Sequence, residues 1–358
     1  MRFDRYIFHQ LLVAFVLSAG GMVFIALPGI AVGAVHKLGS VGMLAVLRFL
    51  PLVVGGFVPY VLPVALLLSL VSTYGRLAAQ NEWTAIRMAG VNPYRLLVPA
   101  FALSALTGIG IFAMNAELLP RIKVMEKTVR VEELRNVFKN LSPGKTDLSL
   151  AGFYLQSVFR DPVDKNTFID CYIEFPPKGE EEPQSFYAET VSFEFLESKM
   201  VVHMYGVRGT TDTVQGMVER LSLSVDFDAL SGGRRQSVFR SAGYQTSAQL
   251  LERLESGELE EPRRLAYLYD WHLRMANAAT CLLFVMIGAS TGILMRKGTQ
   301  LAALAVAIGY AILYWIISLR LGKQLAEAGT VEPWIGAWGP LVLFFGWGLW
   351  LMHRSLRD

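Results

Sequence analysis

The chain has 358 residues, of which 53% are hydrophobic and only 18% are charged, and its mean hydropathy is positive. Ordinary soluble domains carry roughly 25% charged residues, so this composition argues against a wholly soluble protein. The net charge is +3 for the whole chain, but −4 for residues 120–267 and +7 for the remainder. The basic excess lies at the ends of apolar runs, which favours membrane orientation over nucleic-acid binding as its cause.

Six apolar stretches are long enough to cross a membrane as helices, because about 20 apolar residues span the hydrocarbon core. They are residues 11–35, 51–72, 96–114, 275–295, 299–319 and 334–352. Three of them precede the polar middle of the chain and three follow it. The first is too long for the apolar part of a signal peptide and has no clear cleavage site before His36, so we expect it to remain as a span.

Basic residues near the ends of these stretches predict the orientation. If the N-terminus is cytoplasmic, nine basic residues lie inside, namely Arg2, Arg5, Arg76, Arg87, Arg95, Arg296, Lys297, Arg354 and Arg357. Four lie outside, namely Lys37, Arg48, Arg320 and Lys323. Because short cytoplasmic segments carry the excess of Lys and Arg, we expect both termini inside and the middle segment outside.

The middle segment has the composition of β-structure. Five stretches are rich in Val, Phe, Tyr and Thr, and turn-forming residues separate them: 148–159, 167–175, 185–196, 200–205 and 217–227. Short strands without helices between them predict a sandwich or jelly roll. Residues 247–255 then predict a short capped helix, and the chain re-enters the membrane from Arg263. Cys171 lies in the polar middle and Cys281 in an apolar run, so we expect no disulfide between them.

The loop between the second and third spans contains a possible docking helix. In a helix that ends before Gly90, Trp83, Ile86 and Arg87 lie near one face, with Glu82 beside them. Gly90 is suited to a helix C-terminus, and a new helix can begin after it. This pattern favours equally a short cytoplasmic helix that fits a groove on a partner and an interfacial amphipathic helix that has no partner.

Several short motifs, in their order and spacing, resemble the lipopolysaccharide export permeases of the LptF/LptG family. The first is Tyr-Gly-Arg-Leu at 74–77, followed by Glu-Trp-Thr-Ala-Ile-Arg-Met-Ala-Gly-Val at 82–91. The others are His-Leu-Arg at 272–274, Arg-Lys-Gly at 296–298, the stretch 322–329, and Trp-Gly-Pro at 338–340. One departure is Leu341, where family members often have Asn. Residues 77–90 and 206–227 look slightly more like LptF than LptG.

The resemblance implies a fold and a function. The fold would be a membrane α-helical protein with six transmembrane helices, three plus three, and an inserted periplasmic all-β jellyroll-like domain. The expected parts are helices one to three in 1–119, with a coupling helix at about 76–90, the β domain with flanking segments in 120–265, and helices four to six in 266–358. The chain would be an inner-membrane permease that exports lipopolysaccharide using ATP hydrolysis by a separate subunit.

The resemblance also implies partners. These are a cytoplasmic LptB-like ATPase dimer, a second permease in an LptF–LptG heterodimer, and a periplasmic bridge of LptC- and LptA-like proteins, with no nucleic acid and no cofactor. Spans one and five would form gates where the two permeases meet. Four glycines in the first span would allow close packing there: Gly20, Gly21, Gly29 and Gly33.

Two groups of site residues follow from the resemblance. The coupling helix would contact the ATPase through Glu82, Trp83, Ala85, Arg87, Ala89 and Gly90. Glu82 and Arg87 would supply polar contacts, and the small residues would permit close approach. Lys37, Arg274 and Arg320 lie near the outer interface, where they would hold the phosphates of lipid A. Alternatively, these cations only reach towards lipid headgroups.

The sequence offers no strong indication of covalent chemistry. The segment Pro-Gly-Lys-Thr at 143–146 resembles the end of a phosphate-binding loop, but Lys139 stands where its first glycine should be, so we expect a turn. The five histidines show no metal-ligand spacing, and His203 is interpreted as an ordinary strand residue. No nucleophile elbow or histidine-centred set is evident, so we expect no enzyme. The alternative functions are another ATP-driven lipid or lipoprotein exporter, or a membrane-anchored periplasmic sensor or enzyme.

Overall fold

The computed structural model describes residues 2–38, 43–139, 146–150, 153–161, 167–175, 184–195, 199–209, 217–226, 242–257, 259–296 and 298–357. The chain divides into two compact units. The helical unit comprises Met1–Pro28, Val53–Lys123 and Val238–Asp358, and the second unit comprises Gly29–Leu52 and Val124–Ser237. The six strands described below belong to the second unit.

Among the described residues, six helical segments are long and apolar enough to span a membrane, which confirms the three-plus-three prediction. Before the strands come α1 (Arg2–Leu38), α2 (Met43–Ala79) and α4 (Pro93–Ala113), and α4 continues through the π-helical turn η1 (Met114–Leu118) into α5 (Leu119–Lys139). After them come α9 (Glu261–Leu294), α10 (Gln300–Trp315) with η2 (Ile316–Gly322) and α11 (Lys323–Glu327), and α12 (Pro333–Arg357). The short helices are α3 (Glu82–Met88) and α8 (Ser247–Glu255).

The helical unit is packed around α9. Of the apolar window of α9, 72% is buried, compared with 28% for the span that contains α10 and 6% for α1. Glycines bring the central helices close together: a Cβ atom on Gly292 would lie 2.7 Å from the Val71 carbonyl oxygen, and one on Gly108 would lie 2.8 Å from that of Ala278. Small residues at such crossings allow backbones to approach within van der Waals contact. The α9 centre is therefore tight, whereas α1 and α10 are peripheral.

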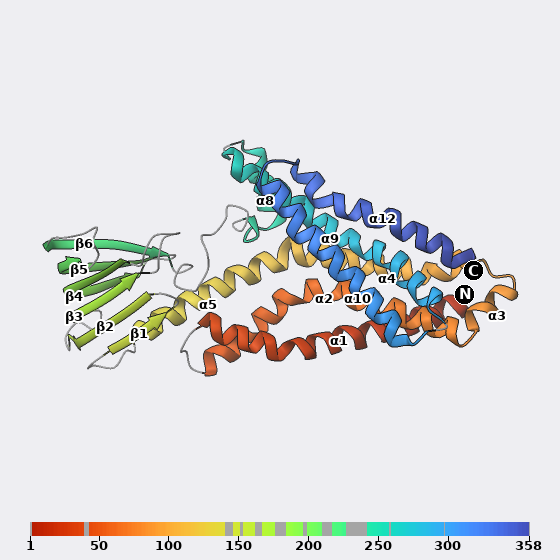
Figure 1. Ribbon diagram of the computed structural model, residues 1–358, viewed down its shortest axis with the longest axis horizontal. Coiled ribbons are helices and arrows are strands. Elements are labelled where there is room, and N and C mark those ends of the chain that lie inside the picture. The colour runs from red at the N-terminus through yellow and green to blue at the C-terminus, as the bar shows by residue number, and fades with distance from the viewer. Residues whose placement is uncertain are drawn as a thin grey trace. The chain divides into compact units, whose positions relative to one another are not determined.

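The two ends of the helical unit differ in what they carry. Figure 1 shows that both chain termini and α3 lie at one end, which we call the α3 end, and that α8 lies at the opposite end, the α8 end. The residues around α8 were predicted to flank the β domain. Instead, Ala242 and Leu250 form a buried cluster with Ala266 and Tyr267 of α9, so this segment packs within the helical unit.

The second unit contains an antiparallel sheet of six described strands. They are β1 (Thr146–Leu150), β2 (Phe153–Arg160), β3 (Thr167–Phe175), β4 (Gln184–Phe195), β5 (Lys199–Gly209) and β6 (Met217–Asp226). The inserted β domain is thus confirmed. The first predicted stretch forms two strands, because Leu150 pairs with Phe153 and the chain reverses between them.

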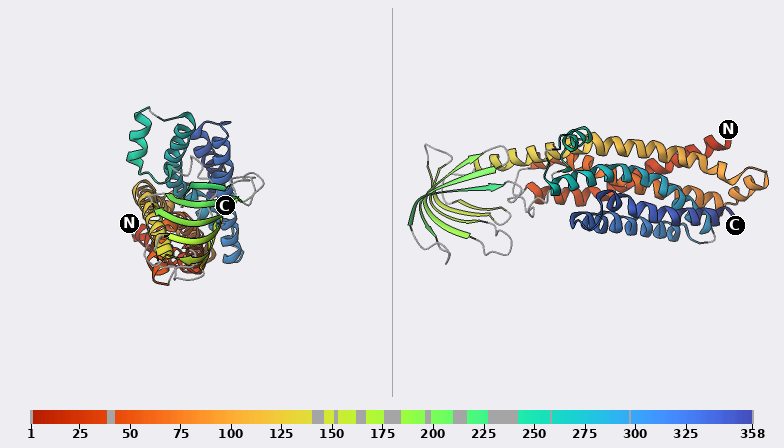
Figure 2. Two further views of the ribbon diagram at one scale, coloured as in Figure 1. Left: turned by 90° about the vertical axis from the view of Figure 1, so that its left-hand side faces the viewer. Right: turned by 90° about the horizontal axis from the view of Figure 1, so that it is seen from above.

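The described strands follow one another in the order β1 to β6 within one curved sheet (Figure 2). The predicted sandwich or jelly roll requires two sheets or crossing connections. The part of the domain that the structure describes instead has the order of a meander, because each described strand pairs with its neighbours in the sequence. Cys171 and Cys281 are both free and buried, and burial, with a smaller effect from Asp170, raises the pKa of the Cys171 thiol to about 12.

The alternation of buried and exposed residues is interrupted at one position on each of three neighbouring strands. The buried residues Phe168 and Cys171 on β3 are three positions apart, as are Ala188 and Val191 on β4, and Met204 and Val207 on β5. Regular strands would place same-face residues two apart. Asp170 (φ 53°) and Gly206 (φ 64°) adopt left-handed conformations at this line, and the register continues on both sides of it. The matched shifts keep one face of all three strands buried.

Replacing Gly206 with alanine is expected to destabilise the β domain by roughly 1–3 kcal/mol. The backbone there is left-handed, and an added Cβ atom would lie 2.8 Å from the Glu189 side chain. Thermal unfolding of the detergent-solubilised chain measures the effect. The double variant Gly206→Ala/Glu189→Ala removes only the steric part, so partial recovery is expected, and an unchanged midpoint for Gly206→Ala would contradict the assigned backbone strain.

Candidate functional site

The predicted docking helix is divided into two helices. Residues up to Ala79 belong to α2, and the seven-residue α3 begins only after Asn81, whose φ of 58° interrupts the helix. The predicted coupling helix of about 76–90 is therefore corrected to α3 and its flanking turns. Gly90 ends the helix as predicted: it has a φ of 83°, and its N–H group donates to the Arg87 carbonyl oxygen at 2.9 Å.

Trp83 fixes α3 to the helical unit. Its side chain is only 1% exposed and meets the ring of Tyr74 edge-on, with 6.1 Å between ring centroids. The Tyr74 hydroxyl donates to the Leu96 carbonyl oxygen at 2.8 Å, which links the end of α2 to the start of α4. Trp83 therefore holds α3 in place and does not present a surface to a partner. An aromatic pair of this geometry adds about 0.5–1.5 kcal/mol to the contribution from burial.

The opposite face of α3 is open. Ala85, Met88, Ala89 and Gly90 are exposed, with Met88 84% exposed, while Glu82 and Arg87 are half-buried. An exposed methionine beside small residues and two opposite charges suits a docking surface, because the methionine adapts its shape and the small residues allow close approach. Five of the six predicted coupling residues thus lie together on an accessible part of α3 and its C-terminal turn.

Arg274 on α9 is buried at the α8 end and is 5% exposed. Its guanidinium group forms an ion pair with Asp270, with Nη2–Oδ2 at 2.6 Å and Nε–Oδ2 at 2.9 Å. It also donates to the Gln245 carbonyl oxygen at 2.8 Å, the Ser247 hydroxyl at 3.0 Å, and the carbonyl oxygens of Ala116 and Ala242 at 3.5 Å. All five N–H groups of the side chain therefore have partners within the protein.

This geometry gives Arg274 a structural role. A side chain with no remaining donor is a joint between α9, η1 and the turn before α8, and not a free phosphate ligand in this conformation. Arg320, on η2, is exposed, in keeping with its predicted position at an interface. Lys37 lies near the end of α1, and its side chain is outside the described residues.

A comparison with protein families resolves which proteins this chain is related to. The sequence model described as lipopolysaccharide export system permease LptF/LptG matches residues 5–354, nearly the whole chain. The chain belongs to the LptF/LptG family. A comparison with curated proteins finds no match. The family match confirms the resemblance seen in the motifs, and it covers LptF and LptG together, so it leaves the predicted lean towards LptF undecided.

Membership of the LptF/LptG family makes the chain a transport permease of the lipopolysaccharide export system, and its six apolar helices make it a multi-pass membrane protein. For an LptF/LptG permease, surfaces that bind a partner or a lipid matter more than reactive groups. Among the described residues, no group of His, Cys, Asp and Glu is arranged to hold a metal ion.

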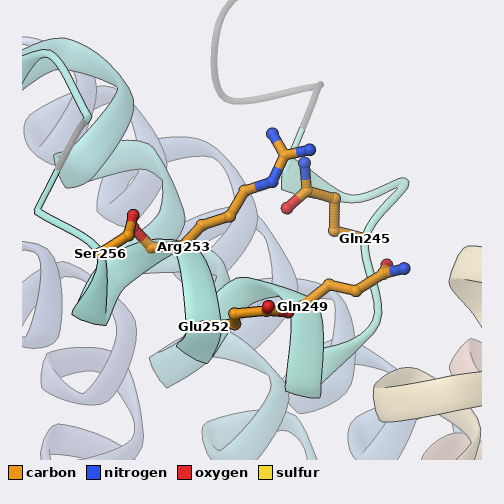
Figure 3. Close-up of a pocket in the computed structure, with 5 residues that line it drawn as sticks. All are labelled: Gln245, Gln249, Glu252, Arg253 and Ser256. Atoms are coloured by element: carbon orange, nitrogen blue, oxygen red, sulfur yellow. The ribbon is translucent and has the colours of Figure 1, made fainter.

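An open polar hollow of about 410 Å³ lies beside α8 of this LptF/LptG permease. Figure 3 shows that Gln245 and Arg253 approach it from facing segments, with Gln249, Glu252 and Ser256 along the helix. All five lining residues are polar, and Gln245 is also part of the joint around Arg274 through its carbonyl oxygen. Among the residues that the structure describes, the hollow is lined by hydrogen-bonding side chains and by no apolar side chain of the kind that typifies a small-molecule pocket.

The β domain of the permease holds a histidine-centred set that the sequence did not reveal. His203 on β5 lies between Ser222 on β6, at 2.9 Å from Nδ1, and Glu194 on β4, at 3.2 Å from Nε2. His203 is thus a strand residue, as predicted, and its two polar partners on the neighbouring strands are what the sequence did not indicate. The order Ser–His–Glu resembles a hydrolase triad, but Ser222 and Glu194 are exposed on an open sheet face, and neither of them lines the hollow beside α8. The set is best explained as a cross-strand polar contact.

Proposed function

We propose that this LptF/LptG protein is one permease subunit of an ATP-driven lipopolysaccharide exporter in the bacterial inner membrane. In this proposal both termini and α3 are cytoplasmic, and the β domain is periplasmic. An LptB-like ATPase dimer docks on α3, a second permease of the family completes the transmembrane cavity, and ATP hydrolysis drives lipopolysaccharide out of the membrane. The observation that carries the proposal is the burial pattern of α3. One face of this helix packs against the core of the helical unit through Trp83, and the other face is accessible.

The geometry of α3 supports a role in force transmission. Trp83 ties it to Tyr74 near the end of α2, and Tyr74 is tied to Leu96 near the start of α4. A partner that holds the exposed face of α3 would therefore displace the ends of two membrane helices together. The charges of Glu82 and Arg87 would fix the register of docking, and Ala85, Ala89 and Gly90 would admit close approach.

The peripheral helices support pairing with a second permease. A Cβ atom added to Gly20, Gly21, Gly29 or Gly33 of α1, or to Gly309 of α10, would meet nothing within 4 Å. Exposed apolar side chains continue along α10 and η2 at Ile308, Ile312, Leu313 and Ile316. In a membrane, small residues on an unpacked helix face permit close helix association. We therefore assign α1 and the span that contains α10 to the gates between the two permeases.

The lipid would be held by cations near the outer face of the membrane and then passed to the β domain. Arg320 and Lys37 are the cations that we assign to lipid A phosphates, and Arg274 takes a positioning role instead. From the β domain the lipid would pass to a periplasmic bridge of LptC- and LptA-like proteins.

Co-purification tests the proposed function. The full chain should co-purify with an LptB-like ATPase and a second LptF/LptG permease, and ATPase activity should appear in the complex but not in the chain alone. Failure to retain the ATPase in any nucleotide state would contradict the proposal.

A further inference from the structure

The first three turns of α1 attach that helix to the helical unit. Ile7 and Leu11 have no exposed surface and belong to the buried cluster that contains Trp83 and Leu356. Of residues 12–28, which the structure describes throughout, none is buried. Apolar packing of α1 is therefore tightest at the α3 end, and the rest of its length within the helical unit contributes only partly buried side chains, such as Phe15 and Met22.

Three polar contacts reinforce this attachment, and each reaches a different element. They are Asp4 Oδ2 to Arg95 Nη2 at 3.5 Å, the Tyr6 hydroxyl donating to Glu82 Oε2 at 3.4 Å, and Arg76 Nη2 donating to Gln10 Oε1 at 2.7 Å. The partners lie on α4, α3 and α2, so α1 joins all three elements of the docking region. Tyr6 reaches the same carboxylate that we assign to the ATPase contact.

Helical spacing places these groups on one side of α1. Asp4, Ile7 and Leu11 recur at intervals of three and four residues, and Tyr6 and Gln10 form a neighbouring row with an interval of four. His9 is two residues from Ile7 and is exposed on the other side. The attachment is thus a stripe of packed and polar groups limited to about the first ten residues.

A helix fixed at one end acts as a lever. With a rise of 1.5 Å per residue, residue 28 lies about 25 Å beyond Leu11, so a tilt of roughly 10° at the attachment would move it by about 4 Å. The tightly packed α9 would instead move with the block that surrounds it, because packed interiors resist deformation. A displacement of α3 would therefore produce its largest movement in α1.

We propose that Asp4, Tyr6 and Gln10 are positioning residues that transmit the movement of α3 to α1. Through them, docking of the ATPase on α3, and the ATP hydrolysis that the docked ATPase carries out, set the tilt of α1. The tilt of α1 in turn sets the opening of the gate between the two permeases. This inference rests on the proposed function, because it takes α3 as the docking site, and it adds the physical link between the docking site and the gate.

A charge swap in the reconstituted complex tests the link. The variants are Asp4→Arg, Arg95→Asp, the double swap, and Tyr6→Phe, with His9→Ala as the matched control on the exposed side of α1. ATPase activity and lipopolysaccharide release per ATP are measured separately.

We expect ATPase activity to stay within about twofold while release per ATP falls roughly threefold to fivefold in the single variants, because exposed contacts are individually weak. The double swap should recover most of the release, and His9→Ala should change neither quantity.

Two results would overturn the inference. One is an unchanged release per ATP in every variant, and the other is a parallel fall in ATPase activity and release that the double swap does not repair. The wild-type complex separates this outcome from failure of the proposed function. A wild type that neither retains the ATPase nor releases lipopolysaccharide refutes the docking proposal itself, whereas a working wild type with unaffected variants refutes only the lever.

Discussion

Replacing Glu82 with lysine is expected to weaken binding of the ATPase subunit by about tenfold or more and to abolish export. Glu82 is half-buried at the first position of α3, beside the exposed small residues, so a reversed charge there would oppose the complementary charge on the partner. Losing a charge contact at the centre of an interface and adding a repulsion typically costs several kcal/mol. Co-purification and equilibrium binding of the ATPase measure the effect.

Two control variants make the Glu82 result specific. Glu82→Gln removes the charge without a repulsion and should give an intermediate loss. Tyr6→Phe removes the contact of Glu82 with α1 without changing any charge, so it should leave ATPase binding intact. If Glu82→Lys still bound the ATPase and exported lipopolysaccharide at the normal level, the assignment of Glu82 to the docking surface would be wrong.

Removing Arg274 is expected to destabilise the helical unit by about 3–5 kcal/mol, because Asp270 would be left as an uncompensated charge at a largely buried position. Arg274→Leu and Asp270→Leu should each lower the thermal midpoint strongly. The double variant should lose less, since both charges leave together and apolar groups replace them. Thermal unfolding in detergent, followed by the loss of monodisperse protein, checks these values.

The same variants decide between the two roles considered for Arg274. Arg274→Lys keeps a positive charge but has only three N–H donors in place of five. If Arg274 connects the helices around it, this variant is expected to be destabilised. A phosphate ligand predicts normal stability with weakened lipid binding, and that outcome would restore the role first expected from its position.

The six membrane spans could be predicted from the sequence, because the length of an apolar run can be read from one segment alone. The ends of some helices could not: α4 continues through η1 into α5 as far as Lys139, well past the apolar stretch 96–114, because a helix continues into polar surroundings once its core packing is set. The start of α9 at Glu261 lies two residues from the predicted start at Arg263. Within the β domain, the strand positions were predictable from composition. The shared phase shift at Asp170 and Gly206 depends on matched backbone conformations in neighbouring strands, which no single strand specifies.

The candidate site was predictable in part. The sequence placed a docking helix before Gly90, but it could not show that Trp83 turns towards Tyr74 and the core, because an amphipathic pattern does not say what covers each face. For Arg274, the i−4 spacing of Asp270 was a readable signal of an ion pair. Its remaining partners come from Ala116 and residues 242–247, which only the tertiary structure brings together. The polar partners of His203 were missed for the same reason, since they follow from strand register.

We propose that this LptF/LptG permease moves lipopolysaccharide with the energy of ATP hydrolysed by a partner docked on α3. Reconstitution of the full complex in vesicles that contain lipopolysaccharide tests this: transfer of the lipid to a soluble bridge protein is followed, and the cargo is identified by mass spectrometry. We expect ATP-dependent transfer of lipopolysaccharide that disappears with Glu82→Lys. ATP hydrolysis without transfer, or transfer of a different lipid or a lipoprotein in its place, would contradict the proposal.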